Sequence, residues 1–172
     1  MLHFSEDPTI TVCVPHVPPT AQVTEPLVWA VDSAIAPAYW FPRDCPRVLA
    51  WVTASTSAED RDRIIGPGGG ERVHAIEYTW LDAMRTFRLF AYRLSADKFR
   101  PRGTPARHAW VSSEAAEPLG PPEPVGDLIA LHHQAGIQLR VLPSITAFWA
   151  SVKGGTLGFS GIRLHNAGLG NG

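Results

Sequence analysis

The sequence predicts a single α+β domain, with a central mixed or antiparallel sheet and short flanking helices. Short apolar runs of strand length alternate with short helical patterns, but not in a regular βα repeat. The length of 172 residues suits one domain. Sixteen Pro and 15 Gly imply many ordered loops and short elements. We expect the domain to cover residues 1–167 and residues 168–172 to form a flexible tail.

The composition excludes several classes of protein. With 45% hydrophobic and 18% charged residues, the chain is too apolar to be intrinsically disordered. A formal net charge of -1 provides no field for non-specific binding to nucleic acid. Since no apolar run is long enough to span a membrane and the first residues lack a signal-peptide pattern, we expect a cytoplasmic protein without a membrane partner. Cys13 and Cys45 are expected to be reduced, small hydrophobic residues.

The first third of the chain predicts strands separated by loops. A short strand over residues 2–4 stops at the polar residues before Pro8. Four prolines between residues 13 and 26 indicate an extended loop. The apolar run 27–31 is typical of a buried strand, and Ser33 is expected to cap a short helix that ends at Ala38. A second apolar strand is expected over residues 47–53.

The middle of the chain alternates helix and strand. Ser57, followed by acidic residues, has the pattern of a helix start, and Gly66 with Pro67 ends that helix. Residues 72–77 alternate as in a strand and lead into a helix over residues 78–86. Residues 87–94 place apolar side chains on both faces, which favours a strand in the middle of a sheet.

The last third follows the same scheme. We expect a short strand over residues 109–112 and a helix from Val125 to Ala135 that stops at Gly136. An alternating strand over residues 137–141 comes next, and Ser144 opens a last amphipathic helix. The segments 66–70 and 117–124, rich in Gly and Pro, are expected to be turns or loops.

No common catalytic motif is present. The sequence lacks HExxH, GxSxG, a Walker A loop and GxGxxG. His74 and Glu77 are three residues apart on a predicted strand, so they face opposite sides and one metal ion could not bind both. His132 and His133 lie near the end of a helix, where imidazolium is favourable, and we assign them a structural role with one or both exposed. No metal site is predicted.

Two arginines and an aromatic run are candidates for ligand binding. Arg43 and Arg47 flank a proline-stiffened loop directly before a strand, from which they could bind phosphate or carboxylate oxygens. Alternatively, Arg43 pairs with Asp44 at the surface, or Arg47 ties the loop to backbone carbonyls. The run Tyr39–Phe41 could stack on a planar base or fill the core.

Four segments carry a family resemblance. His3–Pro8, Val28–Asp32, Tyr39–Arg47 and Phe159–Leu164 resemble a family of uncharacterised bacterial proteins of unknown function, and the likeness covers roughly residues 2–167. This family implies no activity.

A second resemblance concerns the order of the elements. A histidine at the end of the first strand, a strand followed by a helix bearing a tyrosine, and the later strand Trp110–Ser112 are similar to the ADP-ribosyltransferase superfamily. The likeness implies that His3 holds a ribose hydroxyl of NAD and that Tyr39 stacks on nicotinamide. It also implies a glutamate on the late strand that polarises the ribose or the acceptor. This sequence has no glutamate at that place, and His108 or Glu114 stands nearest.

Two functions remain open. The first is a nucleotide-handling transferase that takes NAD or ADP-ribose and cleaves a glycosidic bond through an oxocarbenium-like transition state. NAD would be its co-substrate, and the residues alone imply no further cofactor. Its catalytic residues would be His3, Tyr39, His108 and Glu114, and its ligand-binding residues Ser5, Arg43 and Arg47. The second is a non-catalytic module that binds a small ligand or a protein. A hydrolase using His108 with Ser112 is disfavoured because residues four apart on a strand lie about 13 Å apart.

Overall fold

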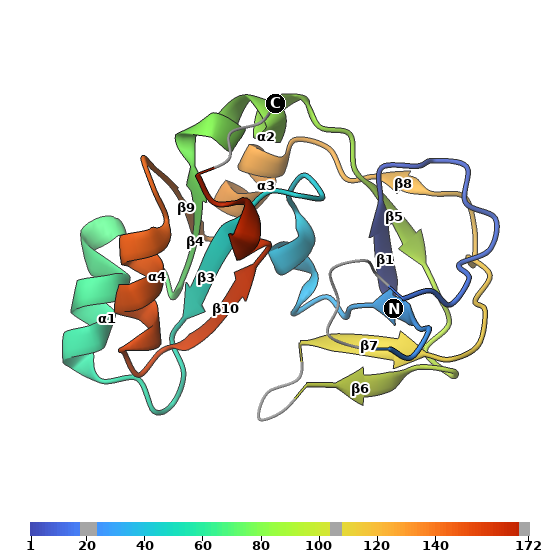
Figure 1. Ribbon diagram of the computed structural model, residues 1–172, viewed down its shortest axis with the longest axis horizontal. Coiled ribbons are helices and arrows are strands. Elements are labelled where there is room, and N and C mark those ends of the chain that lie inside the picture. Colours follow the sequence, from blue (N-terminus) through green and yellow to red (C-terminus); the bar gives the residue numbers. More distant parts are fainter. Residues whose placement is uncertain (18–23, 104–107, 169–172) are drawn as a thin grey trace. The chain divides into compact units, whose positions relative to one another are not determined.

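The computed structural model describes residues 1–17, 24–103 and 108–168. The chain divides into two compact units, which we describe separately. Unit 1 combines Met1–Trp40 with Arg88–Gly126, and unit 2 combines Phe41–Phe87 with Asp127–Gly172. The chain therefore passes from one unit to the other three times, as its colours show in Figure 1. The single domain expected over residues 1–167 stays a prediction.

Unit 1 consists of two small antiparallel sheets. Their strand orders are β1-β5-β8 and β2-β7-β6. The bounds are β1 Leu2–Ser5, β2 Val28–Ala30, β5 Phe90–Arg93, β6 Arg100–Arg102, β7 Ala109–Ser112 and β8 Glu123–Pro124, with the 3-10 helix η1 at Ala36–Tyr39. Reciprocal backbone hydrogen bonds between Leu2 and Val31 join β1 to the end of β2. A small apolar core forms around Val28, Ala30, Leu94 and Phe99.

Unit 2 is built on one mixed sheet with the strand order β10-β3-β4-β9. β3 is antiparallel to both neighbours, whereas β4 and β9 are parallel. The strands are β3 Arg47–Trp51, β4 Arg72–Glu77, β9 Ile137–Leu142 and β10 Gly158–Ile162. The helices are α1 Ala58–Ile64, α2 Leu81–Thr86, α3 Leu128–Gln134 and α4 Thr146–Lys153, with 3-10 turns η2 Gly66–Gly68, η3 Tyr78–Trp80 and η4 Leu164–Asn166.

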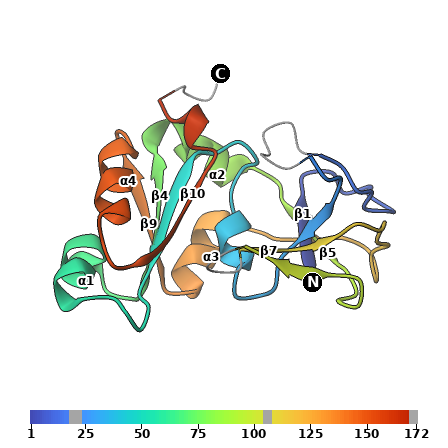
Figure 2. The same cartoon turned by 60° about the horizontal axis from the view of Figure 1, so that its bottom comes forward.

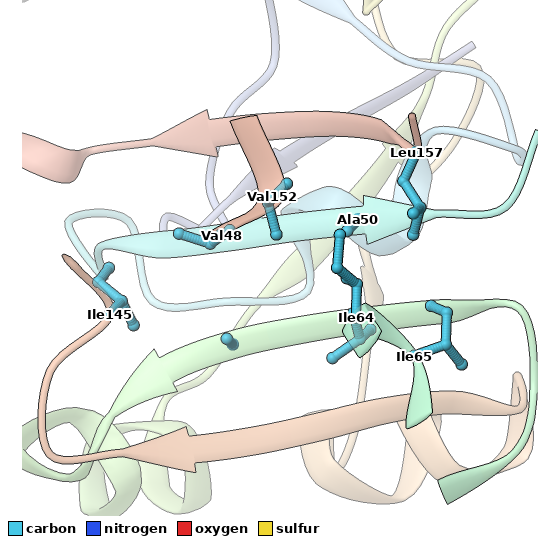
Figure 3. Close-up of a cluster of buried hydrophobic side chains, with 9 residues drawn as sticks. Val48, Ala50, Ile64, Ile65, Ile145, Val152 and Leu157 are labelled. Atoms are coloured by element: carbon cyan, nitrogen blue, oxygen red, sulfur yellow. The ribbon is translucent and has the colours of Figure 1, made fainter. Parts of the chain in front are cut away.

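Strand alternation divides this sheet into two different faces. One face carries small and branched apolar side chains that pack under α1 and α4; the cluster is Val48, Ala50, Ile64, Ile65, Val73, Ala75, Ile145, Val152 and Leu157 (Figure 3). The other face includes His74 and lies against α3, on the opposite side of the sheet from α1 and α4 (Figures 1 and 2). The first face is an apolar core, and the second face holds buried polar groups.

Helix caps follow local sequence signals. Ser57 caps α1, because its Oγ accepts a hydrogen bond from the Asp60 N–H at 3.2 Å, as predicted. Asp127 caps α3 by accepting from the N–H groups of Ile129 and Ala130, so this helix begins at Leu128 and not at the predicted Val125. Gly136, with φ of 65°, ends it as expected.

The α+β class is confirmed, and several local predictions are wrong. The turn before η1 is held by Asp32, whose Oδ1 accepts from the Ile35 N–H at 3.0 Å, and not by Ser33. The strand expected over residues 87–94 is shorter, Phe90–Arg93. The segment 117–124, expected to be a loop, contains β8. Both β6 and β8 contain proline, and both lie at the edge of their sheet, where a missing N–H is tolerated.

The C-terminal end is held in place as far as Gly168. Its N–H donates to Oε2 of Glu77 at 2.7 Å, so this residue of the predicted tail is fixed to unit 2. Residues 169–172 of that prediction lie outside the described residues. No helix among the described residues is long and apolar enough to cross a membrane.

Candidate functional site

His3 is held by a backbone hydrogen bond inside unit 1. Its Nδ1 lies 2.8 Å from the carbonyl oxygen of Trp29 in β2. Because a carbonyl only accepts, Nδ1 must carry a proton. The ring is half-buried and lies 6.4 Å from the ring of Tyr92 in the neighbouring strand β5. This strand-end histidine therefore has a defined orientation, with a proton on Nδ1.

Tyr39 lies at the end of η1, in the same unit as His3. The turn that leads to it is fixed by Asp32, which accepts from the Ile35 N–H through Oδ1 and from Trp110 Nε1 through Oδ2 at 3.1 Å. Val31, the residue before Asp32, is bonded to Leu2, next to His3. The structure thus places the tyrosine and the histidine on one connected framework, and Tyr39 is half-buried.

Ser5 shapes the turn that follows β1. It is 4% exposed, and its Oγ accepts from the N–H of Asp7 at 3.1 Å. The same turn is held by the Tyr92 hydroxyl, which donates to the carbonyl of Asp7 and accepts from the N–H of Ile10. The Ser5 hydroxyl, which the sequence predicts to bind a ligand, forms its hydrogen bond within the protein.

His108 and Glu114 lie at opposite ends of β7. A four-residue strand between them places them on the order of 15 Å apart. His108 is exposed, and its N–H donates to the carbonyl of Arg102. Glu114 forms a 2.8 Å ion pair with Lys98 at the surface, and the hydrogen bond from this ammonium lowers the pKa of the carboxyl.

The two arginines belong to unit 2 and differ in exposure. Arg43 is exposed, whereas Arg47 is 4% exposed. The Arg47 guanidinium donates from Nη1 to the carbonyl of Cys45 at 2.9 Å and lies 4.9 Å from the ring centre of Phe41. Asp44 pairs with Arg163 at 3.7 Å. Arg47 ties the loop to a backbone carbonyl, as in the second alternative drawn from the sequence.

Unit 2 contains a buried histidine pair. Nδ1 of His74 lies 3.0 Å from Nε2 of His132, and the two side chains are 1% and 0% exposed. Nδ1 of His132 donates to the carbonyl of Leu128 at 2.6 Å, so Nε2 of His132 must accept from Nδ1 of His74. The ring of Phe41 packs against both imidazoles, at 5.7 and 5.0 Å between centres.

The surroundings of this pair keep both imidazoles neutral. Burial lowers the pKa of His74 well below its usual value, and His132, Arg72 and Arg47 lower it further. Burial also lowers the pKa of His132, despite its bond to Leu128, with a contribution from Arg47. In the same unit, burial raises the pKa of the Cys45 thiol to about 12, so this cysteine is a poor nucleophile at neutral pH.

Glu77 lies at the end of β4 and has a separate role. Its carboxylate, 2% exposed, accepts from the N–H groups of Ile145 and Gly168. His74 instead bonds to His132, so His74 and Glu77 have separate partners. Across the described residues, no group of three His, Cys, Asp or Glu side chains is placed to hold a metal ion.

The sequence carried a weak signal for the histidine pair. His132 follows Leu128 by four residues and therefore lies on the buried face of α3, whereas His133 is exposed. His74 alternates with the apolar residues Val73 and Ala75 in a strand that is buried on both faces. Each position is predictable as buried, but the contact between them is not.

These features define an α+β protein with a fixed strand-end histidine in one unit and a neutral histidine pair in the other. The chain belongs to the family of unknown function DUF6886, which it matches over residues 2–167. The predicted membership in an uncharacterised family is therefore confirmed. No curated protein and no solved structure matches the chain, and the resemblance to ADP-ribosyltransferases is not confirmed.

Proposed function

We propose that this protein binds NAD or ADP-ribose in the cytoplasm and transfers the ADP-ribosyl group, with His3 orienting the ribose. The observation that carries the proposal is the 2.8 Å hydrogen bond from His3 Nδ1 to the carbonyl of Trp29. This bond fixes the orientation of the imidazole ring, and a ring held in this way can form a hydrogen bond with a ribose hydroxyl. NAD held by His3 through its ribose would be oriented before the glycosidic bond is cleaved.

Tyr39 supplies the aromatic ring for nicotinamide in this proposal. Its position at the end of η1, on the framework that also holds His3, supports the assignment. Arg43 and Arg47 belong to unit 2 and have no part in the site proposed in unit 1.

The proposed stabiliser of positive charge is Glu114. A carboxylate near the anomeric carbon favours the oxocarbenium-like transition state. The ion pair with Lys98 keeps the pKa of Glu114 low, so the group is negatively charged at neutral pH. In this role, the carboxylate would exchange Lys98 for the developing charge on the sugar.

The alternative function is a non-catalytic module that binds a small ligand or a protein. It is favoured by the way the predicted polar groups are used internally: Ser5 accepts from Asp7, and Arg47 donates to Cys45. In this case, the chain would bind a small ligand or a protein and would release no nicotinamide from NAD.

The test is a thermal shift with NAD, ADP-ribose and AMP. A ligand that binds only the folded state raises stability by RT ln(1 + [L]/Kd), which is about 2.7 kcal/mol at a hundredfold excess over Kd. We expect a shift with NAD or ADP-ribose that is lost in His3→Ala. The matched control is His16→Ala, because His16 is an exposed histidine of the same unit whose Nδ1 also lies near a carbonyl. The absence of a shift at millimolar ligand in the folded wild type would refute the proposal.

Nicotinamide release separates the two functions. If the transferase proposal is correct, the wild type releases nicotinamide from NAD. The variant Glu114→Gln then binds NAD normally but releases nicotinamide much more slowly. Binding without release, in the wild type, would instead establish the non-catalytic module.

A further inference from the structure

The histidine pair of unit 2 joins a short helix to the sheet. His132 lies in α3 and His74 in β4, and Nδ1 of His74 donates to Nε2 of His132 at 3.0 Å. The other nitrogen of His132 donates to the carbonyl of Leu128, one turn earlier in the same helix. α3 has only seven residues, and a helix of this length is marginal in water without packing partners. Its packing on β9 and α2 and its bond to His74 therefore keep it folded.

The pair also lies at the two places where the chain enters unit 2. The chain enters this unit at Phe41 and again at Asp127, directly before α3. The ring of Phe41 lies against both imidazoles, with its centre 5.7 Å from that of His74 and 5.0 Å from that of His132. A change at the pair therefore acts on both entry segments.

The hydrogen bonds of the pair leave no place for a further proton. Nδ1 of His132 already donates to Leu128. A proton added to Nε2 of His132 would meet the N–H that His74 directs at it, and two donors would then face each other without an acceptor. A proton added to Nε2 of His74 would instead charge a ring that is 1% exposed. Either proton is accepted more readily once α3 has left the sheet and the rings have reached water.

Charged neighbours of the pair oppose protonation as well. Burial lowers the pKa of His74, and the cations Arg72 and Arg47 lower it further; burial also lowers the pKa of His132, with a contribution from Arg47. Other titratable groups of the surrounding elements are uncharged, bonded to the backbone, paired with each other or exposed: Cys45, Glu77, Arg140, Asp44 with Arg163, Asp82 with Arg85, Arg43, Asp127 and His133. Two cations on β3 and β4 thus add to the effect of burial.

We propose that the His74–His132 pair is an acid-sensitive switch, in which protonation of the rings releases α3 from the sheet of unit 2 while the sheet stays folded. The apolar core on the opposite face includes neither histidine, so the packing under α1 and α4 remains. After release, residues 127–136 lengthen the chain that joins Gly126 of unit 1 to β9. This switch is independent of the nucleotide function.

The size of the effect follows from the number of protons taken up. A released imidazole binds a proton at the usual histidine pKa of 6.5. Between roughly pH 7.5 and pH 5.5, the population in which α3 is released should therefore rise about tenfold for each ring that is protonated. Because both rings lose their partners when the helix leaves, we expect a total rise between about tenfold and about a hundredfold.

Native-state hydrogen exchange, followed by NMR in the full chain, tests the proposal. The amide protons of Leu131 and Ala135 report on α3, because both donate within this helix. Those of Ile65, at the end of α1, and Trp149, in α4, report on the opposite face of the sheet. After correction for the intrinsic effect of pH, opening at α3 should show the expected rise and a weak dependence on urea, which marks local opening. The two control amides should exchange with the strong urea dependence of global unfolding.

Either of two results in the wild type would overturn the proposal. The first is a rise in α3 opening of less than about threefold over this pH range. The second is a urea dependence at Leu131 and Ala135 as strong as that at Trp149, since α3 would then open only when the whole unit unfolds.

A double variant separates the pair from a general effect of acid. His74→Leu combined with His132→Met replaces both rings by apolar side chains of similar volume, which leaves no buried donor without its acceptor. Opening of α3 in this variant should be independent of pH, whereas His133→Gln, at the exposed neighbouring histidine, should keep the wild-type dependence. A double variant that keeps this dependence would refute the proposal. If the double variant does not fold, the wild-type exchange measurement decides by itself.

Discussion

His74 donates a hydrogen bond from Nδ1 to Nε2 of His132 across 3.0 Å in the interior of unit 2. The direction follows from the second nitrogen of His132, which must donate to the carbonyl of Leu128. Two neutral imidazoles therefore link β4 to α3 through an ordered chain of donors and acceptors. Protonation of both rings would place two N–H donors against each other in a site that excludes water.

Acid should destabilise the protein because of this pair. The pKa of both histidines is lowered in the folded state, chiefly by burial, so the unfolded chain binds protons more readily. The stability that the two neutral imidazoles contribute is fully present above the usual histidine pKa of 6.5, and it decreases as the pH falls below that value. By about pH 5 the loss is at most about 2 kcal/mol for each imidazole. Urea unfolding between about pH 7.5 and pH 5 measures it, and an unfolding free energy that is constant or rises toward acid would contradict this account.

The neighbouring histidines of α3 should differ sharply in their effect on stability. His132→Ala removes a fully buried ring that bonds to His74 and packs on Phe41, so we expect a loss of roughly 2–4 kcal/mol. His133 is exposed, and His133→Ala should change stability by less than about 0.5 kcal/mol. Chemical denaturation of the two variants makes the comparison, and similar values would show that the pair is not a structural link.

Asp60 should titrate at unusually low pH. Hydrogen bonds from Arg63, and then from Thr156, lower the pKa of its carboxyl to about 2. Its Oδ2 accepts from both the N–H and the hydroxyl of Thr156 at 2.8 Å, which joins α1 to the loop before β10. The stability that this carboxylate contributes is present above the usual pKa of 3.8. It is lost as the pH falls through the lowered pKa of the folded protein. Carboxyl-carbon NMR measures the midpoint, and a normal midpoint would show that these bonds are not formed in solution.

Gly158→Ala should destabilise unit 2. A Cβ at this position would lie 2.3 Å from Nε1 of Trp51, so the indole would have to move. We expect a cost of about 1–3 kcal/mol. Gly120→Ala is the control, since nothing lies within 4 Å of the position that its Cβ would take, and its effect should be within about 0.5 kcal/mol. Thermal unfolding of both variants gives the comparison; equal effects would mean that the Trp51 ring does not occupy this place.

Local signals predicted much of the secondary structure correctly. Ser57 and Gly136 act through their own backbone and side-chain chemistry, so the start of α1 and the end of α3 could be predicted. The strands β6, β8 and β10 were missed because their glycine and proline residues disfavour a strand locally. They form because a neighbouring strand offers hydrogen bonds, and no local pattern contains that information.

The candidate site was only partly predictable for the same reason. A histidine at the end of the first strand could be singled out from the sequence, but the carbonyl that orients its ring belongs to Trp29, 26 residues away. His74 and His132 are 58 residues apart, and only the fold brings them into contact. The exposure of Arg43 and the burial of Arg47 depend likewise on packing, since both flank the same short loop.

The most direct test of the central claim is a long-range proton–nitrogen NMR spectrum of the histidine rings. In the protein without ligand, we predict that His3 carries a proton on Nδ1, which donates to the carbonyl of Trp29. Addition of ADP-ribose should move the His3 Nε2 signal and leave that of His16 unchanged. A proton on Nε2 of His3 in the neutral ring, or an unchanged Nε2 signal when millimolar ADP-ribose is present, would contradict a ribose held by His3.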